Sequence, residues 1–557
     1  MKATEINPNT LSLINETLNA MGAKEIKFSE YQLNIFRFLL ENKGQSATIN
    51  AVAGSGKSFT IKWATKLMAK TFGMKPRDIA MIAFNRSIVE ELKAEMDAFC
   101  SCATSHSVGF SAIAKTYFKR VTDKDGKKIW LTCPNMDTTM KKYWFQLIQG
   151  YIVNALNISV EEVDALMVSN VYKLFTQARV NLLRAYDANE ISALAFHFGI
   201  DLDEKGITLA CVQHLLNDAY KVHYFGDLPC IDFVDMITIP CVDEKVKRNL
   251  WKYKLVFIDE CQDLNFAQRT LLLNILWYGA RFIAVGDPKQ AINGFAGADC
   301  DSFSKLTQLA KGNELTLSVN YRCGSEIVNL AQSIVPQIQA HEGAIKGEII
   351  DVYDLKECRE GDMILCRKSA PLVGVALKFL AKGVKAEIMG QDVLKGIINT
   401  IKHTKAKRID TMLDYLDKEY AQKEQINRKD PKKVSGTQLI NFADTISAIK
   451  AVAEDIDWRS NTGVADLIKK VSSLFAEKDD KKKTDVVTLC TAHKSKGLEN
   501  ERVFILLPDK LPLQWKNQQD WELEQEYNLR YVAITRAKEK LYWVNVAEEK
   551  LANIKVR

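Results

Sequence analysis

The sequence predicts an α/β protein with an open, mostly parallel sheet that carries polar groups where its strands end. Three segments predict this fold class, because each is a short apolar run followed by a polar turn: residues 46–58, 253–265 and 281–295. Polar groups after several strands are typical of ligand sites at the carboxyl edge of open α/β sheets. The chain has 557 residues, of which 47% are hydrophobic. This length and composition predict several domains with cores of their own.

The first segment contains AVAGSGKS, residues 51–58, which is close to the phosphate-loop pattern G-x-x-x-x-G-K-[ST]. The apolar run before it and the helical spacing of apolar residues after it place this loop between a strand and a helix. Gly54 and Gly56 allow a turn that points several backbone N–H groups at one anion. Ala51 replaces the first glycine of the pattern, which costs little where φ is negative. A ligand-free turn between strand and helix is the alternative for this segment alone.

The second segment, YKLVFIDECQDLN, predicts a buried strand that ends at two acids, Asp259 and Glu260. Beside a phosphate loop, Lys57 can reach the β- and γ-phosphates and Ser58 can bind Mg²⁺. Asp259 can hold the same Mg²⁺ through water, and Glu260 can orient or deprotonate the attacking water. Two acids after a strand are also ordinary turn chemistry, but their pairing with the phosphate loop favours a nucleotide site.

The third segment, RFIAVGDPKQAINGF, places Asp287 and Gln290 after another strand of the same sheet. The formal net charge of +7 suits a polyanionic partner, but many proteins without such a partner carry a similar charge. The twelve cysteines include no C-x-x-C pair, which favours buried thiols in a reducing compartment over a zinc or iron–sulfur site. We find no signal peptide and no membrane-spanning stretch, so we expect a soluble protein of the cytoplasm.

Seven ordered stretches resemble the motifs of superfamily 1A helicases, the UvrD/Rep-like group, and AFNRS and GDPKQ add some resemblance to the F-box DNA helicase branch. Members of this group often carry alanine at the first position of the phosphate loop. The resemblance implies two RecA-like parallel-sheet motor domains, each interrupted by a mainly helical insertion. In chain order the matching stretches are FSEYQLNIFRFL, AVAGSGKS, DECQD, VGDPKQAINGFAGAD, LSVNYRCGSEIVNLA, VVTLCTAHKSKGLENERVFIL and NLRYVAITRAKEKLYWV.

The resemblance implies a role for several residues around ATP and Mg²⁺. Gln32 would read the adenine edge, Tyr321 would stack on the adenine, and Glu499 would contact the ribose or another part of the nucleotide. Gln290 would sense the γ-phosphate, and Arg322 and Arg536 would act as arginine fingers, although a surface salt bridge is the ordinary role of either arginine taken alone. The catalytic candidates are Lys57, Asp259, Glu260, Gln290, Arg322 and Arg536; the nucleotide-binding candidates are Gln32, Ala53, Gly54, Ser55, Gly56, Lys57, Ser58, Tyr321 and Glu499; and the metal-binding candidates are Ser58 and Asp259.

The motif order predicts where the two motor domains and their insertions lie. The second insertion is lysine-rich, as in KHTKAKR and EKDDKKKTD, and it looks shorter than its counterpart in most relatives. Solvated helix faces are the default for such charge runs, with a phosphate-binding surface as the alternative. The first motor domain is predicted at residues 1–103 and 222–317, its helical insertion at 104–221, the second motor domain at 318–399 and 485–557, and the reduced insertion at 400–484.

A track for single-stranded DNA is implied at the same sheet edge. Two stretches, AFNRS and TSHSVGF, resemble the motifs that contact DNA, and a structural histidine is the alternative for His106. Phe295 would stack on bases without reading their sequence, with a place in the core as its alternative. The pattern departs from the family at Asn293, in place of an aromatic, and at Ala296, in place of an arginine. The nucleic-acid candidates are Phe84, Asn85, Arg86, Thr104, His106, Phe295 and His493.

These motifs predict an ATP-dependent single-stranded DNA translocase and DNA helicase, which would move 3′ to 5′ as the resemblance implies. Its expected partners are single-stranded DNA and junctions of single- and double-stranded DNA, with no membrane. One alternative is a translocase subunit that strips proteins from DNA or serves a nuclease partner, since we find no nuclease domain in the chain. A nucleotide-gated scaffold and an RNA motor are further alternatives. The pathway, whether repair, recombination, replication or defence, stays open.

Overall fold

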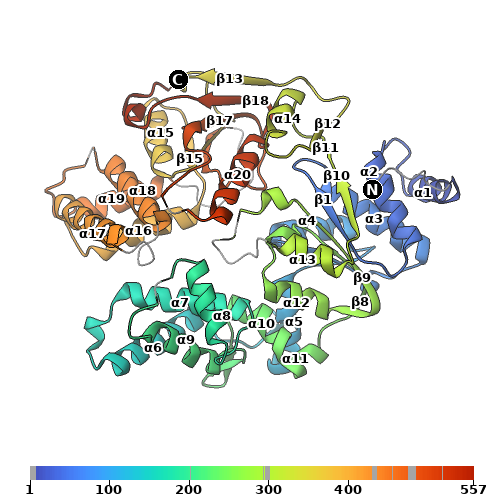
Figure 1. Cartoon of the computed structure of the whole chain (residues 1–557), viewed down its shortest axis with the longest axis horizontal. Helices are drawn as coiled ribbons and strands as arrows, with labels where there is room; N and C mark the ends of the chain where they lie inside the picture. The colour runs from blue at the N-terminus through green and yellow to red at the C-terminus, as the bar shows by residue number, and fades with distance from the viewer. Residues whose placement is uncertain are drawn as a thin grey trace. The chain divides into compact units, whose positions relative to one another are not determined.

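The structure of this chain is a computed structural model that describes residues 8–123, 125–200, 202–292, 294, 301–429, 436–454, 456–474, 485–516 and 518–556. The chain forms two compact units (Figure 1), which are described one at a time below. The first unit comprises Met1–Ala51, Gly56–Pro288 and Asn293–Leu317. The second comprises Val52–Ser55, Lys289–Ile292 and Ser318–Arg557. Two short segments whose chain neighbours on both sides belong to the first unit therefore pack with the second unit.

The first unit is built on a six-stranded sheet with the order β10-β1-β9-β8-β2-β3. All neighbouring strands run parallel, so their carboxyl ends meet at one edge. The sheet confirms the predicted α/β class and contains the three strands that the sequence predicted. Its strands are β1 (Ala47–Ala51), β2 (Ile79–Ala83), β3 (Ser101–Thr104), β8 (Tyr253–Ile258), β9 (Leu276–Gly286) and β10 (Glu314–Leu317).

Alternate residues of the central strands enter two separate hydrophobic cores. On β8, Leu255 and Phe257 pack with helices α1 to α4, whereas Val256 and Ile258 pack against helices α5, α10, α12 and α13. A strand that is buried on both faces reads as a continuous apolar run, as this one does. The helices of this unit outside the first insertion are α1 (Pro8–Ala20), α2 (Glu30–Glu41), α3 (Lys57–Phe72), α4 (Arg86–Met96), α5 (Ser105–Tyr117), α10 (Phe233–Val242), α11 (Glu244–Arg248), α12 (Phe266–Asn274) and α13 (Ser302–Leu309).

Between β3 and β8 the chain forms a helical subdomain with a core of its own. Its helices are α6 (Met136–Leu156), α7 (Ala165–Val180), α8 (Ala188–His197) and α9 (Ile207–Asp218). Two antiparallel hairpins flank these helices, one of β4 (Arg120–Thr122) and β5 (Lys128–Trp130), the other of β6 (His223–Phe225) and β7 (Leu228–Cys230). Figure 1 draws the four helices in teal and green.

A buried charged cluster joins this subdomain to the sheet. Arg179 on α7 is fully buried and donates two hydrogen bonds of 2.8 Å to Asp232 and one of 2.6 Å to Asp235. The two aspartates form the capping box of α10, which packs on α5 and α12. Trp144 of α6 also donates to Asp232, at 3.3 Å. One guanidinium therefore connects the insertion to a helix that covers the sheet.

The cluster changes the pKa of each of its acids. Burial would raise the pKa of Asp232, but the Arg179 guanidinium outweighs burial and lowers it. Burial and the neighbouring Asp232 charge raise the pKa of Asp235 from its ordinary value of 3.8 to about 7. A single cation thus holds one ionised carboxylate firmly, while the second carboxyl group retains its proton more readily.

The second unit contains another six-stranded sheet, with the order β13-β18-β17-β14-β16-β15. Its neighbouring strands are also all parallel. On β17, Val503 and Ile505 pack with helices α14 and α20, and Phe504 and Leu506 pack with helices α15 to α19. The strands of this unit are β11 (Val319–Asn320), β12 (Gln339–Ala340), β13 (Glu348–Val352), β14 (Met363–Cys366), β15 (Ala386–Ile388), β16 (Val487–Thr491), β17 (Asn500–Leu506) and β18 (Ala537–Val544).

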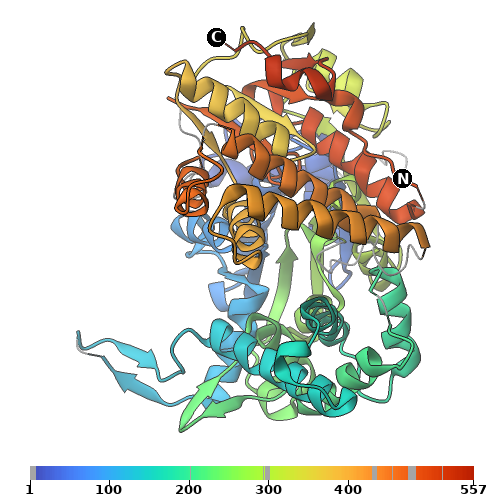
Figure 2. The same cartoon turned by 90° about the vertical axis from the view of Figure 1, so that its left-hand side faces the viewer.

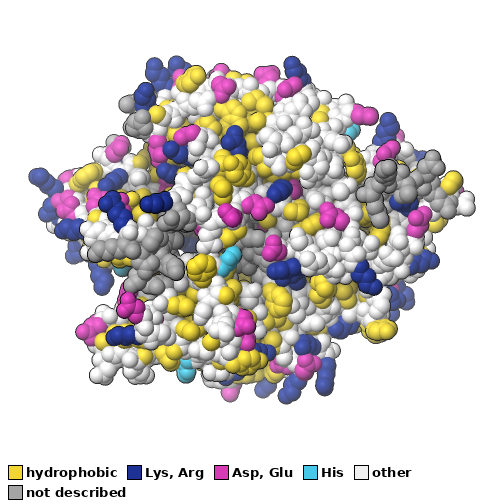
Figure 3. Space-filling view, viewed as in Figure 1, with side chains coloured by type: hydrophobic (Ala, Val, Ile, Leu, Met, Phe, Trp, Pro, Cys, Tyr) yellow, Lys and Arg dark blue, Asp and Glu magenta, His cyan; other side chains and the backbone are white. Residues whose placement is uncertain are grey.

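Four of the second unit's helices lie in one run of the chain between β15 and β16. Acidic and basic side chains pair along them, as in Arg428 with Glu424 and Lys450 with Asp417. On the face shown in Figure 3, both kinds of charge are mixed over these helices at the left. Such mixing is typical of solvated helix faces. The helices of the unit are α14 (Ser325–Ala331), α15 (Ala370–Ala381), α16 (Gln391–His403), α17 (Ile409–Lys429), α18 (Gly436–Ala453), α19 (Gly463–Ser473) and α20 (Asp520–Ile534).

Within the part of the chain that the structure describes, no helix is both long enough and apolar enough to cross a bilayer.

Replacing Arg179 with methionine should destabilise the first unit by about 3–5 kcal/mol, because it leaves two buried carboxyl groups without their cation. Urea unfolding monitored by tryptophan fluorescence measures this loss. The matched control is Arg86→Met, which breaks an exposed ion pair with Glu90 and should cost less than about 1 kcal/mol. Equal losses in the two variants would contradict a special role for the buried cluster.

The raised pKa of Asp235 predicts a pH-dependent stability. The folded chain holds this proton at pH values where the unfolded chain has lost it, so the contribution is complete below pH 4 and is lost as the pH rises through about 7. The Asp235→Asn variant cannot titrate at this position. Relative to this variant, the wild-type chain should lose stability between about pH 4 and pH 7, on the order of 1 kcal/mol per pH unit, and should show no further loss above that range. Parallel stability curves for the two proteins would contradict the assignment.

Candidate nucleotide-binding site

The phosphate loop follows β1 and ends where α3 begins. Gly54 and Gly56 have φ values of 65° and 75°, in the left-handed region that favours glycine. Lys57 is the first residue of α3, so the free backbone N–H groups of the helix N-terminus lie beside its side chain. This is the strand–loop–helix arrangement that the sequence predicted, and it suits the binding of an anion.

Lys57 is surrounded by the acids that follow β8 and β9. Its Nζ lies 3.0 Å from Oε1 of Glu260. Burial lowers the pKa of Lys57, but Glu260, Asp287 and Asp259 together outweigh burial, and the pKa is raised. The lysine therefore keeps its positive charge at the carboxyl edge of the sheet, where phosphates would need it.

Ser58 and Asp259 form the second contact of this site. The Ser58 hydroxyl donates to Oδ2 of Asp259 at 3.2 Å, and the backbone N–H of Asp259 donates to Ile82 on the neighbouring strand. Burial and the adjacent Glu260 raise the pKa of Asp259 to about 6. Two crowded carboxyl groups beside a hydroxyl provide oxygen ligands of the kind that Mg²⁺ prefers. Ser58 and Asp259 therefore fit the predicted metal site.

Gln262 links the two acidic strand ends, although it was not among the predicted site residues. Its Nε2 donates to Glu260 at 2.5 Å, and its Oε1 accepts the backbone N–H of Asp287 at 3.1 Å. A Cβ on Gly286 would lie 2.4 Å from this Oε1, so only glycine fits there. Gln262 belongs to the DECQD stretch, but one of its two partners, Asp287, follows the third predicted strand, and the spacing of DECQD alone cannot reveal that contact.

Gln32 lies beside the loop and is almost fully buried. Its side chain accepts the backbone N–H of Ser29 at 2.9 Å, which closes the capping box of α2, and donates to Thr60 on α3 at 3.0 Å. These bonds fix the side chain at the start of both helices. The structure thus places the predicted adenine-reading residue next to the phosphate loop.

The remaining loop residues, Val52–Ser55, pack within the second unit. The backbone N–H of Ala53 donates to the Tyr531 hydroxyl at 2.8 Å, and Nδ2 of Asn320 donates to the Ala53 carbonyl at 2.7 Å. The backbone N–H of Tyr321 donates to the Gly54 carbonyl at 2.9 Å. Asn320 and Tyr531 were not among the predicted site residues, although they lie in the motif stretches LSVNYRC and NLRYVAI. The loop backbone is therefore held by side chains that lie far along the chain.

Arg322 forms an ion pair with Glu499, with 2.7 Å between Nε and Oε2. Lys538 contacts the same carboxylate at 2.5 Å. Burial would raise the pKa of Glu499, but the two cations outweigh it and lower it. The structure thus brings two predicted nucleotide contacts, Arg322 and Glu499, into direct contact with each other.

Arg536 lies close to this pair and is 1% exposed. Its guanidinium donates to the backbone carbonyls of Val532 and Leu498, each at 2.8 Å. Burial and the Arg322 charge lower its pKa to about 10, so it stays protonated at neutral pH. Among the described residues, no carboxylate lies within hydrogen-bond distance of the Arg536 guanidinium. Backbone carbonyls are therefore its hydrogen-bond acceptors, as a buried cation requires.

Tyr321 and Gln290 differ in exposure. Tyr321 is 43% exposed and its ring packs against His341, with 4.9 Å between centroids. Gln290 is buried, and its backbone carbonyl accepts a hydrogen bond of 2.8 Å from Lys496, in the AHKSKG stretch. The exposed Tyr321 ring is available for stacking. The Gln290 backbone is held by its hydrogen bond from Lys496, within the second unit.

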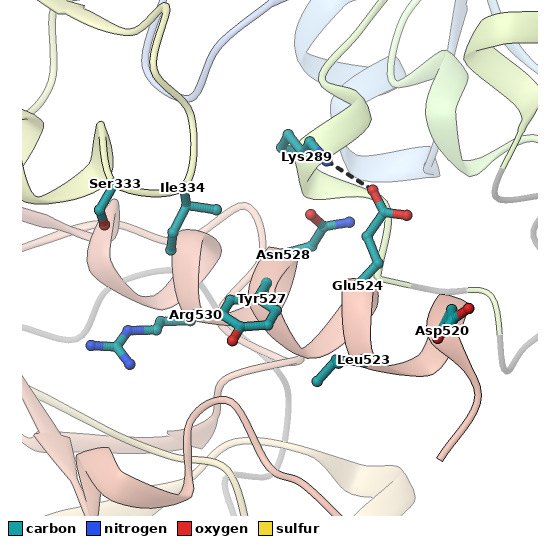
Figure 4. A pocket seen from close by; sticks show the side chains of 9 residues that line it. All are labelled: Lys289, Ser333, Ile334, Asp520, Leu523, Glu524, Tyr527, Asn528 and Arg530. Carbon is teal, nitrogen blue, oxygen red and sulfur yellow. Dashed lines mark hydrogen bonds and ion pairs between the residues drawn. The ribbon is translucent and has the colours of Figure 1, made fainter. Parts of the chain in front are cut away.

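A pocket of about 720 Å³ lies beside the Gln290 segment, along α20. Figure 4 shows Lys289 reaching the carboxylate of Glu524 on α20, at 2.8 Å. Tyr527 and Asn528 line the pocket from the same helix. Asn528 also donates to the carbonyl of Ala291, at 3.2 Å. These contacts fasten residues 289–292 to the helix that leads to Arg536.

The predicted DNA contacts of the first unit lie at the carboxyl ends of β2 and β3. Phe84 follows β2 and is 47% exposed, and the side chain of Arg86 is 91% exposed. Asn85 caps α4 and Thr104 caps α5 through their side-chain oxygens. Burial lowers the pKa of His106, so its ring is neutral at neutral pH. The parallel sheet thus brings all five residues to the edge that carries Lys57.

The two remaining predicted DNA contacts are Phe295 and His493. Phe295 falls outside the described residues, as do Asn293 and Ala296. His493 belongs to the second unit, where burial and the Arg367 charge lower its pKa to about 3. Its ring is therefore a neutral group that can donate or accept a hydrogen bond but carries no charge for a phosphate.

The fold and the site together define a P-loop nucleotide-binding protein with two parallel-sheet units. The profile of the UvrD/REP helicase N-terminal domain matches residues 37–311, and that of the UvrD-like helicase C-terminal domain matches residues 379–548. The chain belongs to the UvrD-like helicase family. The predicted family and its two RecA-like domains are therefore confirmed.

Three similar proteins place the chain within this family. A probable DNA helicase II homolog of Mycoplasma pneumoniae is 26% identical over 419 residues, which are 57% of this chain and 58% of the relative. F-box DNA helicase 1 of Gallus gallus is 22% identical over 333 residues, 56% of this chain and 28% of the relative. RecBCD enzyme subunit RecB of Buchnera aphidicola is 38% identical over 121 residues, 20% of this chain and 10% of the relative. The alignments therefore span at most about three fifths of the length of these relatives.

Replacing Lys57 with alanine should weaken ATP binding roughly 100-fold or more, because it removes charge-assisted hydrogen bonds to the phosphates. Equilibrium titration with a fluorescent ATP analogue measures the affinity. Lys62→Ala is the matched control, since Lys62 lies on the same helix but pairs with Glu95 at its surface and should retain wild-type affinity. Tight binding by the Lys57 variant would contradict the phosphate-loop assignment.

Proposed function

We propose that the protein is an ATP-dependent single-stranded DNA translocase and DNA helicase that moves 3′ to 5′. The observation that carries this proposal is the contact of Lys57 and Ser58 with Glu260 and Asp259 at one sheet edge. Membership of the UvrD-like helicase family supports the choice of DNA as substrate. The proposal includes action in the cytoplasm and on junctions of single- and double-stranded DNA.

In this proposal Lys57 binds the β- and γ-phosphates, and Ser58 and Asp259 hold Mg²⁺. Bound Mg²⁺ would neutralise charge on the phosphates during their cleavage. In the structure Glu260 is the ion-pair partner of the Lys57 ammonium. When the phosphates replace Glu260 as the ion-pair partner of Lys57, the Glu260 carboxylate becomes available to orient or deprotonate water. Gln262 would then hold the Glu260 carboxylate in place through its hydrogen bond.

The residues of the second unit would make hydrolysis depend on its engagement with the nucleotide. Arg322 and Arg536 are proposed to stabilise negative charge on the γ-phosphate, which is the role of arginine fingers. The ion pair with Glu499 holds the Arg322 guanidinium in one orientation. Gln290 is proposed to sense the γ-phosphate, and its backbone contact with Lys496 offers a route from nucleotide to the AHKSKG stretch. Tyr321 and Gln32 are proposed to hold the adenine.

The DNA strand is proposed to cross the edge formed by Phe84, Asn85, Arg86, Thr104 and His106. An exposed aromatic ring accepts any base as a stacking partner, which suits motion along DNA of any sequence. Phe295 and His493 are proposed as further contacts. Alternating grip between the two units would then convert each cycle of hydrolysis into a step.

A second candidate function is supported by the similarity to RecB, whose name describes it as a subunit of a larger enzyme. The protein would then be a translocase that strips proteins from DNA or serves a nuclease partner without processive unwinding. Both candidates share the ATPase cycle. They differ in whether translocation separates the strands of a duplex.

The test combines Mg²⁺-dependent ATPase with strand displacement on duplexes that carry a 3′ or a 5′ single-stranded tail. We expect single-stranded DNA to raise ATPase strongly, RNA to raise it less, and only the 3′-tailed duplex to be unwound. Stimulated ATPase without unwinding would favour the translocase subunit. ATPase that does not respond to DNA would contradict both motor functions and leave a nucleotide-gated scaffold.

Replacing Glu260 with glutamine should lower kcat by roughly 10²–10⁴-fold while ATP binding is retained, since general-base catalysis contributes about this factor. The Glu95→Gln variant is the control, because Glu95 pairs with Lys62 and Lys66 at the surface. Its kcat should equal that of the wild type. An unaffected kcat in the Glu260 variant would remove this residue from the catalytic assignment.

A further inference from the structure

The hairpin of β4 and β5 is a two-stranded ribbon that projects from the first unit. Its register pairs Arg120 with Trp130, Val121 with Ile129, and Thr122 with Lys128. The backbone N–H of Leu131 donates to the Lys119 carbonyl at 2.8 Å, which extends the pairing by one residue. Figure 2 shows the ribbon in light blue, extending away from the helices at the lower left.

The base of the ribbon is anchored in the core, and its far end is exposed. Phe118, directly before the ribbon, is 7% exposed and contacts Phe110 edge to face, with 5.8 Å between centroids. Trp130 is partly buried against the same core. Beyond the ribbon, the N–H of Cys133 donates to the Pro229 carbonyl of the neighbouring hairpin, at 3.0 Å. The base of the ribbon is therefore held in place by packing and hydrogen bonds to the rest of the first unit.

Among the described residues of this ribbon, four exposed cations are distributed over its two faces. Directly paired residues share a face and successive residues alternate, so Arg120 and Lys128 lie on one face and Lys119 and Lys127 on the other. Within the described ranges, none of the four forms an ion pair with a carboxylate. The carboxylate of Asp123 is engaged by the turn, where it accepts the N–H groups of Asp125 and Lys127. Asp125 in the turn is exposed as well, so the described residues of the ribbon carry four cations against two acids and present a net positive charge to solvent.

The arrangement of these cations suits a double helix better than a single strand. A two-stranded ribbon fits the major groove of DNA, and lysines along its edges reach the phosphates on either side. Binding of a single strand relies on aromatic faces on which bases stack. The one aromatic residue in the ribbon is Trp130, and the Arg120 guanidinium covers its ring, with 4.6 Å to the centroid.

We propose that the β4–β5 ribbon binds the sugar–phosphate backbone of duplex DNA. This proposal rests on the proposed function for the choice of DNA among polyanions. Val121 and Ile129 form an exposed cross-strand pair between the basic residues of one face. This pair would lie against the groove, while the cations reach the phosphates on both sides. The ribbon would then hold the duplex region of a junction.

The test is equilibrium binding of the full chain to a blunt-ended, fluorescein-labelled duplex without nucleotide, over a series of salt concentrations. Each lost phosphate contact lowers the slope of log affinity against log salt by about 0.9. The K127Q/K128Q variant should therefore lower this slope by about 2 and weaken binding roughly 10- to 100-fold at 0.1 M salt. The control K75Q/R77Q removes two equally exposed charges from the loop before β2 and should bind like the wild type.

The following outcomes would overturn the proposal. Equal duplex affinity in wild-type chain and K127Q/K128Q would overturn it, as would an equal loss in the control. A V121S/I129S variant that loses duplex affinity while the lysine variant keeps it would show that the ribbon contacts the duplex through its apolar pair and not through phosphates, which also overturns the proposal. Because the measurement uses neither ATP nor single-stranded DNA, the ribbon proposal can fail while the motor stands. Conversely, DNA-independent ATPase with salt-sensitive duplex binding would defeat only the motor.

Discussion

The lysine at the start of α3 is the charge on which the site depends. Lys57 lies among three acids that follow neighbouring strands, and it bonds directly to Glu260. Without this cation, Asp259 and Glu260 would place two like charges in a buried corner, an arrangement that burial alone already makes unfavourable. The same ammonium is the group that phosphates would attract. One ammonium therefore stabilises the neighbouring carboxylates and is also the charge that a phosphate group would contact.

The parallel sheet makes this concentration of charge possible. Because all six strands of the first unit end at one edge, short polar turns after β1, β8 and β9 meet without long loops. Gln262 then connects the turns after β8 and β9 through two hydrogen bonds. In the second unit, Arg322 forms an ion pair with Glu499, and Arg536 donates hydrogen bonds to backbone carbonyls. Both arginines therefore have hydrogen-bond partners, which a low-dielectric environment requires of a cation.

The position of the helical subdomain depends on the buried ion pairs of Arg179 with Asp232 and Asp235. Arg179 has both carboxylates of the α10 capping box as partners, so the orientation of the insertion is fixed by directional hydrogen bonds as well as by apolar packing. Both acids lie in the stretch IDFVDMI, residues 231–237, where no site residue was predicted. Their shared partner lies more than fifty residues earlier in the chain, on a helix whose position depends on tertiary packing. Local sequence patterns contain no signal for such a contact.

The sequence by itself determined the fold class, the phosphate loop and the acids at the strand ends, because these features depend on short-range periodicity and on turns of a few residues. It also carried the family, through motifs whose order is preserved along the chain. Only the tertiary structure decided which side chains meet: that Glu260 pairs with Lys57, that Gln262 reaches the turn after β9, and that Asn320 and Tyr531 hold the backbone of Ala53. Such pairings depend on strand order and helix packing, which residues distant in the sequence establish together.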